Sequence, residues 1–218
     1  MRKALLVVLS VSACVVAGGV ATAAPKVKPV CNLVVDAAAD ASVDPAGVAK
    51  DDALDVLSVD VASNKSDITA VLRVKKLASS ASGIPAATNW SVNFSADGTD
   101  FSMAGHTTVA GTQVFDTAYA GATGGSLYGP GTTGVFDTAK NEVRITAPLS
   151  LLSAQAYIKA GKTKVTGIGG TTGPELLVPD VSGTFGPTIF SWNPATADGT
   201  EAGRDYLAGS PSCVVPGK

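Results

Sequence analysis

The chain has 218 residues, of which 45% are hydrophobic and 16% are charged, and its formal net charge is -2. This composition excludes a disordered or collagen-like chain, because enough apolar residues are present to form a core. The net negative charge offers no electrostatic attraction for DNA or RNA, so a nucleic-acid-binding protein is not expected.

The first segment has the features of a secretory signal peptide. Met1-Arg2-Lys3 is basic, the apolar stretch that follows is uncharged through Val20, and Ala21-Thr22-Ala23 is a small-residue cleavage site. Residues 1–23 are therefore predicted to be removed, which leaves residues 24–218 as the exported protein. No later apolar run reaches the roughly 18 residues that a transmembrane helix needs.

The cysteines bear on both the compartment and the topology. Removal of the leader leaves Cys31 and Cys213, one near each end of the mature chain. Two cysteines in an exported protein favour a disulfide, which would bring the two chain ends together. An alternative is that Val11-Ser12-Ala13-Cys14 is a lipobox, in which Cys14 would be lipidated and anchor the protein to a membrane. The apolar run continues past Cys14, which favours cleavage after Ala23.

Apolar and polar residues alternate with a period of two along much of the mature chain, which predicts β-strands. The first two clear strands are residues 54–61 and 68–75, joined by a polar turn at residues 63–66. In the second strand the apolar side chains share one face, and Val71 is the one apolar residue on the polar face. Both strands are expected to cover a core with one side only.

A hairpin is predicted next. Residues 90–95 alternate in polarity, and residues 100–103 alternate again after the turn. The pair Asp97-Gly98 between them is a strong hairpin signal, because both residues adopt the positive φ angles of a tight turn easily.

The second half of the chain carries weaker signals. A second hairpin is predicted over residues 136–147, and Pro148 suits the start of a short helix at residues 149–155. Short strands are expected at residues 164–166 and 188–192, within a tail rich in Gly, Pro and Thr.

This pattern of short strands with one short helix predicts an all-β fold. Two antiparallel sheets packed face to face, as a jelly-roll-like or immunoglobulin-like β-sandwich, fit it best. No linker-like change in composition divides residues 24–218, so a single domain is expected.

The order of several segments resembles the DOMON-like sandwiches, which include the family-nine carbohydrate-binding modules. The segments are Asp36 to Asp40, Leu54 to Asp60, Trp90 to Phe94 with Asp97-Gly98, and Val143 to Leu151. The resemblance covers roughly residues 36–152, and the second half departs from it. It implies a β-sandwich that binds sugars or, in some members, haem, and it implies no catalysis.

His106 is the only histidine, and Met103 lies three residues before it. A methionine and a histidine together can ligate haem iron. On a strand, however, positions three apart point to opposite faces. We therefore expect Met103 in the core and His106 exposed on the outer face, and we do not expect haem.

Aromatic side chains are the candidates for a carbohydrate site, since they stack on the apolar faces of sugar rings beside polar groups that bind hydroxyls. Tyr119 and Tyr128 lie in residues 118–133, which we interpret as a long structureless loop that binds the ligand. Trp192 is a third candidate, whereas alternation places Trp90 in the core. A surface loop without a ligand is the alternative.

Aspartates near the N-terminal end of the mature chain form a candidate metal site. Asp36 and Asp40 belong to one acidic group and Asp55 to another. Their carboxylate oxygens suit calcium, which takes about six to eight oxygen ligands. The prediction is a structural ion, and the alternative is a solvated acidic surface.

No catalytic motif is recognisable. The chain has no G-x-S-x-G, no H-E-x-x-H and no G-x-G-x-x-G that opens a helix. The expected function is therefore an exported, non-catalytic protein that binds a carbohydrate or a cell-surface ligand. The alternative is a structural or adhesive surface protein that recognises protein partners, for which a large exposed apolar patch would be the sign.

Overall fold

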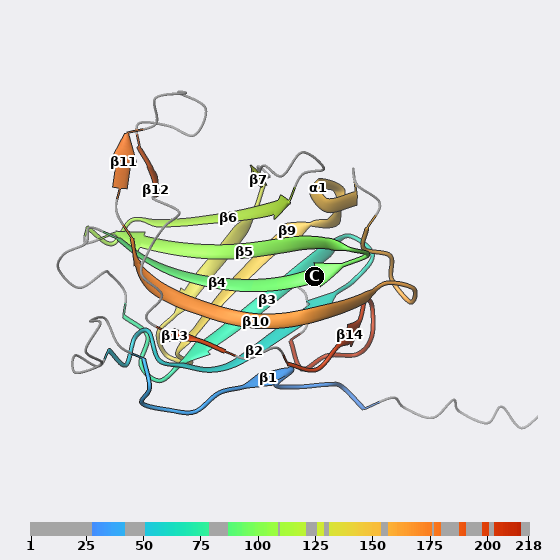
Figure 1. Ribbon diagram of the computed structural model, residues 1–218, viewed down its shortest axis with the longest axis horizontal. Coiled ribbons are helices and arrows are strands. Elements are labelled where there is room, and N and C mark those ends of the chain that lie inside the picture. Colours follow the sequence, from blue (N-terminus) through green and yellow to red (C-terminus); the bar gives the residue numbers. More distant parts are fainter. Residues whose placement is uncertain are drawn as a thin grey trace, which may run out of the picture.

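The computed structural model describes residues 28–41, 51–78, 87–108, 110–120, 126–128, 131–153, 157–175, 177–179, 188–190, 198–200 and 203–214. Within them the chain forms two antiparallel sheets packed face to face, with one short helix (Figure 1). The all-β, two-sheet sandwich predicted from alternation is confirmed.

Sheet 1 contains five strands in the order β1-β2-β3-β9-β8. They are β1 (Val34–Val35), β2 (Val56–Ser63), β3 (Asp67–Val74), β9 (Glu142–Pro148) and β8 (Thr133–Asp137). The predicted β2–β3 hairpin is confirmed, but β2 begins later than expected. Leu54 closes a turn instead, in which its N–H donates to the carbonyl of Asp51.

Sheet 2 has the order β13-β10-β4-β5-β6-β7, and β14 also pairs with β10. Its strands are β13 (Asp198–Gly199), β10 (Lys164–Glu175), β4 (Ala87–Ala96), β5 (Thr99–Thr108), β6 (Gln113–Ala120), β7 (Ser126–Tyr128) and β14 (Tyr206–Leu207). A separate two-stranded ribbon pairs β11 (Leu177–Pro179) with β12 (Thr188–Phe190). The C-terminal half of the chain thus completes the sheet that the β4–β5 hairpin begins.

Turn chemistry predicted the hairpins correctly. Asp97 and Gly98 both have positive φ angles, of 49° and 79°, and they join β4 to β5. The β8–β9 turn ends at Asn141, which has a φ of 55°. Positive φ values at both central residues match the right-handed twist of paired strands.

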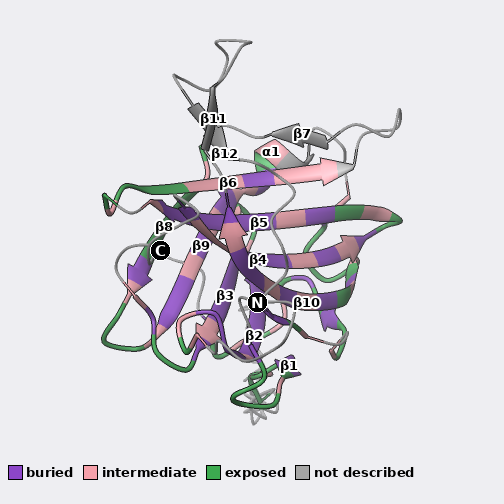
Figure 2. Ribbon diagram, turned by 60° about the vertical axis from the view of Figure 1, so that its left-hand side comes forward, coloured by how far each residue is buried: buried purple, intermediate pink, exposed green. Residues whose placement is uncertain are grey.

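The core lies between the two sheets, and Figure 2 shows buried residues along β3 and β9. Trp90 contributes from sheet 2, as alternation predicted, and its ring meets Phe136 edge to face at 5.2 Å.

Gly170 explains why most of the long strand β10 was not predicted from the sequence. A Cβ at this position would lie 2.8 Å from a methyl group of Val59 and 3.1 Å from one of Leu72. Glycine is therefore what lets the sheets approach, and glycine also obscures alternation.

The first and last segments of the described structure meet on the outer face of sheet 1. Val30 donates a backbone hydrogen bond to Pro211, and Cys213 donates one to Val30. The predicted disulfide between Cys31 and Cys213 is present, with a Cα–Cα distance of 5.2 Å. The C-terminal segment also explains the apolar residue on the polar face of β3, because Val71 packs there against Ala62 and Val214.

The interpretation of residues 118–133 as a structureless loop is wrong for its described part. Strand β6 continues to Ala120, β7 pairs back against it, and β8 begins at Thr133. Small residues in this stretch hide the alternation on which strand prediction depends.

The one helix of the described residues is α1 (Leu149–Ser153), at the position predicted. It begins directly after β9, and Leu149 N donates to the carbonyl of Ser66. No helix in the described ranges is long and apolar enough to cross a membrane.

Candidate functional site

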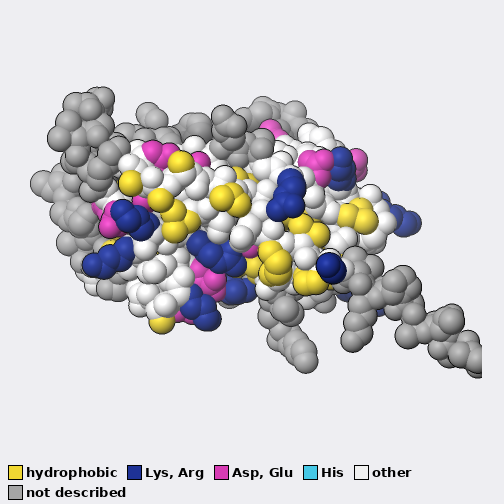
Figure 3. All heavy atoms as spheres, turned by 90° about the horizontal axis from the view of Figure 1, so that it is seen from below, with side chains coloured by type: hydrophobic (Ala, Val, Ile, Leu, Met, Phe, Trp, Pro, Cys, Tyr) yellow, Lys and Arg dark blue, Asp and Glu magenta, His cyan; other side chains and the backbone are white. Residues whose placement is uncertain are grey.

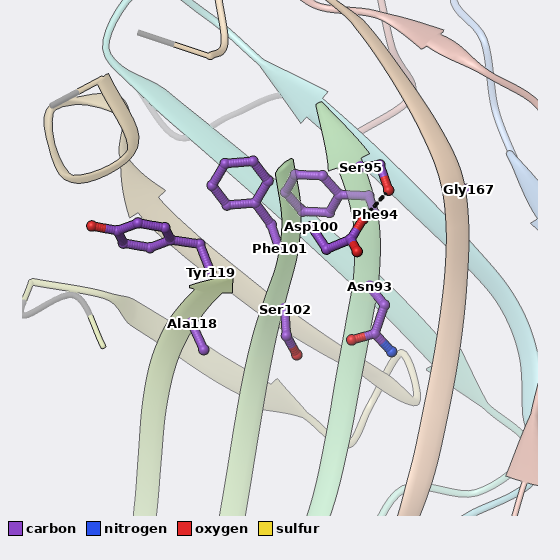
Figure 4. Close-up of a pocket in the computed structure, with 9 residues that line it drawn as sticks. All are labelled: Asn93, Phe94, Ser95, Asp100, Phe101, Ser102, Ala118, Tyr119 and Gly167. Atoms are coloured by element: carbon purple, nitrogen blue, oxygen red, sulfur yellow. Dashed lines mark hydrogen bonds between the residues drawn. The ribbon is translucent and has the colours of Figure 1, made fainter. Parts of the chain in front are cut away.

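A shallow depression at the β4–β5 turn end of sheet 2 is one candidate ligand site in the described part of the chain (Figure 4). Its volume is about 370 Å³. It is lined by Asn93, Phe94, Ser95, Asp100, Phe101, Ser102, Ala118, Tyr119 and Gly167. These residues come from the adjacent strands β4, β5, β6 and β10.

Strand register places a polar row on the outer side of the depression. Asn93 of β4 lies opposite Ser102 of β5, and Ser102 lies opposite Ala118 of β6. Figure 4 shows these three side chains on one side of the sheet. Because Ala118 is small, the row leaves room above β6, while Asn93 and Ser102 present an amide and a hydroxyl.

The next row along the strands is aromatic and points to the other side of the sheet. Phe94 pairs with Phe101, and Phe101 pairs with Tyr119. Ring centroids are separated by 5.4 Å in the first pair and 6.0 Å in the second. Phe94 and Phe101 are buried, whereas Tyr119 is half-buried at the end of the row. Tyr119 therefore belongs partly to the core and partly to the lining of the depression.

Hydrogen bonds hold the polar side chains of the depression in place. Ser95 Oγ donates to Asp100 Oδ1, and Asn93 Nδ2 donates to Thr171 Oγ1 at 3.3 Å. Within the described residues, the second oxygen of Asp100 and the amide oxygen of Asn93 have no hydrogen bond from protein. Both oxygens are acceptors, and the Ser102 hydroxyl can donate or accept. The arrangement can therefore bind a ligand that is rich in hydroxyl groups.

A second depression, of about 460 Å³, lies near α1. It is lined by Lys65, Ser66, Asp67, Pro148, Leu149, Ser150 and Ile158. None of these residues is aromatic, so this depression is the weaker candidate for a sugar.

The opposite end of sheet 2 carries a buried charged network around His106. Nδ1 of the imidazole lies 2.7 Å from Glu175 Oε2, and Nε2 lies 3.1 Å from Asp116 Oδ2. Asn89 donates from Nδ2 to the other oxygen of Glu175, at 3.1 Å. Neighbouring strands supply these groups: β5 carries the histidine, β6 the aspartate, β10 the glutamate and β4 the asparagine.

This network keeps the imidazole charged. Burial alone would lower the pKa of His106, but the hydrogen bonds to Asp116 and Glu175 outweigh burial and raise that pKa to about 9. A protonated imidazole with both nitrogens bonded to carboxylates cannot act as a general base. The arrangement therefore suits a structural role.

The expectation that His106 is exposed is wrong, although its side chain points away from the core as expected. Met103 is fully buried in the core and His106 points the other way, as the strand period requires. Yet His106 is only 4% exposed, because the network surrounds it with polar groups from neighbouring strands. Its hydrogen-bonded ring nitrogens do not fit haem iron, and Met103 lies on the opposite side of the strand.

The predicted metal-ligand aspartates are partly brought together. Asp36 and Asp40 lie in the loop after β1, and a carboxylate oxygen of each lies within 4.8 Å of one from Asp198 in β13. Asp55 is not in this group, but its Oδ2 accepts a 2.7 Å hydrogen bond from Ala39 N of the same loop.

Asp198 was not predicted from the sequence, because it lies in a Gly- and Pro-rich tail that is distant in sequence from the other acids. It is 9% exposed, and its Oδ2 accepts a 2.6 Å hydrogen bond from Val56 N. Burial raises the pKa of Asp198, and the charges of Asp40 and Asp36 raise it further, against the lowering effect of two backbone hydrogen bonds.

Two of the predicted ligand-binding residues cannot be placed. Trp192 lies outside the described residues. Tyr128 is the last residue of β7, where its backbone pairs with Ala118, but its side chain is outside the description. Only the backbone of Tyr128 is therefore placed, next to Ala118, which lines the depression.

Asn93, Asp100 and Ser102 were not predicted as site residues. The alternation showed the polar face of the β4–β5 hairpin. It did not show that this face lies close to Tyr119, because the end of β6 was interpreted as part of a loop at residues 118–133. Recognition of β6 would have placed these residues together.

The fold and the site define a two-sheet antiparallel β-sandwich with a polar and aromatic depression on one sheet. Comparison with protein-family models gives no match, and comparison with curated proteins also gives none.

Proposed function

We propose that the protein is an exported, non-catalytic binding protein that takes a carbohydrate in the depression lined by Tyr119. The observation that carries this proposal is the set of polar groups on the outer side of the depression, Asn93, Asp100 and Ser102; the half-buried Tyr119 lines the same depression with a ring that points to the other side of the sheet. Sugars present apolar ring faces and a rim of hydroxyls, so a site for them needs both kinds of partner.

The rigidity of the support favours a binding site. Paired strands carry all three polar groups, and hydrogen bonds from Ser95 and to Thr171 hold two of them. Preorganised polar groups lose little conformational entropy when a ligand binds. The DOMON-like resemblance also points to sugar binding, and the sandwich agrees with it at the level of fold.

Non-catalytic binding is part of the proposal. Hydrolysis of a sugar would need two carboxyl groups across the scissile bond. Among the described lining residues, Asp100 is the one carboxylate of the depression. The only histidine of the chain is bonded at both nitrogens, away from this site.

Export is supported by the leader-like residues 1–23 and by the disulfide. Disulfides persist mainly in oxidising compartments outside the cytosol. The bond between Cys31 and Cys213 is therefore what an exported protein would keep.

The described surface gives less support to adhesion through a large apolar patch. The exposed large hydrophobic side chains, Val35, Val114, Val135 and Leu207, lie on four different strands. On the face that Figure 3 shows, hydrophobic side chains form small separate groups among polar ones. Recognition of a protein partner is the alternative function, and the test below can favour it.

The test is a screen of soluble and insoluble glycans with the purified protein and two matched variants. Ser102→Gln should fill the depression and weaken binding by about tenfold or more. Ser150→Gln makes the same change in the second depression and should leave binding unchanged. If no glycan binds the wild type, the proposal is contradicted and a protein partner becomes the better hypothesis.

A further inference from the structure

Residues 211–214, the terminal strap, are the last described segment of the chain and lie against the outer face of sheet 1. Two backbone hydrogen bonds fasten the strap, and both go to Val30. Val30 N donates to the carbonyl of Pro211 at 3.1 Å, and Cys213 N donates to the carbonyl of Val30 at 3.2 Å. In the described part of the chain, no backbone hydrogen bond joins the strap to a strand of sheet 1.

One side chain of the strap is buried against the sheet. Val214 is 1% exposed and packs on Ala62 of β2 and Val71 of β3, in a cluster that is separate from the main core. Strand register places Val71 opposite Asp60, whose buried carboxylate forms an ion pair with Arg73. The strap therefore covers an apolar strip that borders a buried pair of charges.

Contacts that are independent of the disulfide fix the chain immediately before the strap. Tyr206 Oη donates to the carbonyl of Ser210 at 2.9 Å, and Gly209 N donates to Ser63 Oγ of β2 at 2.9 Å. The Tyr206 hydroxyl also accepts a hydrogen bond from Ser63 N, and the tyrosine is only 1% exposed. Movement of the strap can therefore begin after Ser210 without disturbing the chain before it.

The N-terminal segment is also fixed on its own, just after Cys31. Leu33 is 2% exposed, and its N–H donates to Asp60 Oδ1. The carbonyl of Leu33 accepts a 2.8 Å hydrogen bond from Arg204 N. Both sides of the disulfide are thus tied to the sandwich by other contacts, which confines any opening to the strap and the few residues that it touches.

The disulfide between Cys31 and Cys213 is the covalent link of the strap, and it is accessible. Cys213 is exposed and Cys31 is half-buried. Without this bond, two hydrogen bonds and the burial of one valine must offset the conformational entropy of four ordered residues, and these opposing contributions are of similar size. The closed and open forms of the strap are therefore close in free energy once the bond is reduced.

We propose that the terminal strap is a redox-controlled cover, which is closed over Ala62 and Val71 when the Cys31–Cys213 bond is formed and opens when the bond is reduced, while the sandwich stays folded. In the opening step a dithiol reductant becomes a disulfide, the bond between the two sulfurs breaks, and each sulfur takes up one proton and one electron. In the closing step a disulfide oxidant receives the same two electrons and two protons.

The reduced, open form is the one expected in a reducing cytosol, so the strap would close after export. This order of events rests on the proposed function. The redox control of the strap does not rest on it, because it concerns sheet 1 and needs no ligand.

The first test is hydrogen exchange of backbone amides, followed by NMR on the purified protein without ligand, before and after reduction by a dithiol. After reduction, the amides of Val30 and Cys213 should exchange about a hundredfold faster or more, at a rate that low urea does not change, because local opening exposes little surface. The amides of β3 should exchange more slowly, and their rates should rise with urea. The double variant Cys31→Ser with Cys213→Ser should show the same pattern without reductant.

The exchange data decide between a strap and a bond that only supports the whole fold. The proposal is overturned if the amides of Val30 and Cys213 keep their protection after reduction. It is also overturned if these amides exchange only together with those of β3 and with the same urea dependence.

Val214→Ser measures the contribution of the closed strap in each redox state. In the oxidised protein this substitution should lower the thermal midpoint by several degrees, because a buried valine is lost. In the reduced protein the strap is already open, so the midpoint should change by less than about one degree. Val35→Ser, the same substitution at an exposed position of β1, should have equal effects in both states. Equal effects of Val214→Ser in both states would contradict the redox control.

Discussion

In both sheets every second side chain points away from the core, but these outward side chains are buried on sheet 1 and border an open depression on sheet 2. On sheet 1 the outward Asp60 is fully buried, bonded to Arg73 at 2.7 Å and to the N–H of Leu33. On sheet 2 the outward Asn93 and Ser102 border an open depression. A period of two identifies the side chains that leave the core, whereas other segments of the chain decide whether they reach solvent.

Sheet 2 shows the same contrast along its own length. His106 and Asn93 both point outward, yet His106 is held among carboxylates at one end and Asn93 lines the depression at the other. The closed regions should therefore determine stability, and the open region should determine binding. The following predictions test this division.

The largest loss of stability should come from removing the disulfide. The double variant Cys31→Ser with Cys213→Ser should lose up to roughly 5 kcal/mol of unfolding free energy, because the disulfide closes a very long loop. Urea unfolding measures the loss, and the folded variant should still bind the ligand of sheet 2. An unchanged unfolding midpoint would show that the bond contributes little.

Breaking the ion pair on sheet 1 should come next. Arg73→Leu leaves the buried Asp60 without its charged partner and should destabilise the protein by about 3 kcal/mol. Adding Asp60→Asn should recover part of this loss, since the unpaired charge is then removed. Chemical unfolding of the two variants provides the comparison, and no recovery would argue against an electrostatic cause.

The His106 network should make stability depend on pH. The folded pKa of about 9 lies above the unfolded value of about 6.5, so the folded state binds the proton more tightly. The stabilisation is fully present below about pH 6.5 and is lost as the pH rises through about 9. The thermal midpoint should fall by several degrees over this range.

His106→Gln is the control for this dependence. It should be less stable than the wild type at pH 6, because two carboxylates lose their cation, and its midpoint should decline less between pH 6.5 and 9. Equal slopes for the two proteins would contradict the assignment of the pH dependence to this residue.

The smallest effect on stability is expected at the depression. Asn93→Ala changes a half-exposed side chain away from the core, so unfolding free energy should shift by less than about 0.5 kcal/mol. Ligand affinity should nevertheless fall. A variant that loses stability and keeps affinity would reverse the proposed division between the two regions.

Local signals in the sequence were enough for the parts of the fold that depend on local chemistry. The Asp97-Gly98 turn, the β2–β3 hairpin and the short helix after Pro148 all follow from neighbouring residues. Strands β6 and β10 were missed or underestimated because their glycines, alanines and threonines carry little alternation. In β10 the glycine at Gly170 is required by the approach of sheet 1.

The candidate sites were harder to predict because they depend on long-range pairing. Asp36 and Asp40 were recognised as an acidic group, but Asp198 joins them only through β13. The direction of His106 was predictable, and its burial was not, because Glu175 comes from β10, which is distant in sequence.

The most direct test of the central claim is a backbone-amide NMR titration of the protein with the glycan that binds best in the screen. Our account predicts that the largest shifts fall on residues 93–95, 100–102 and 118–119, with little change along β2 and β3. Shifts confined to sheet 1, or no shifts with any glycan, would contradict it.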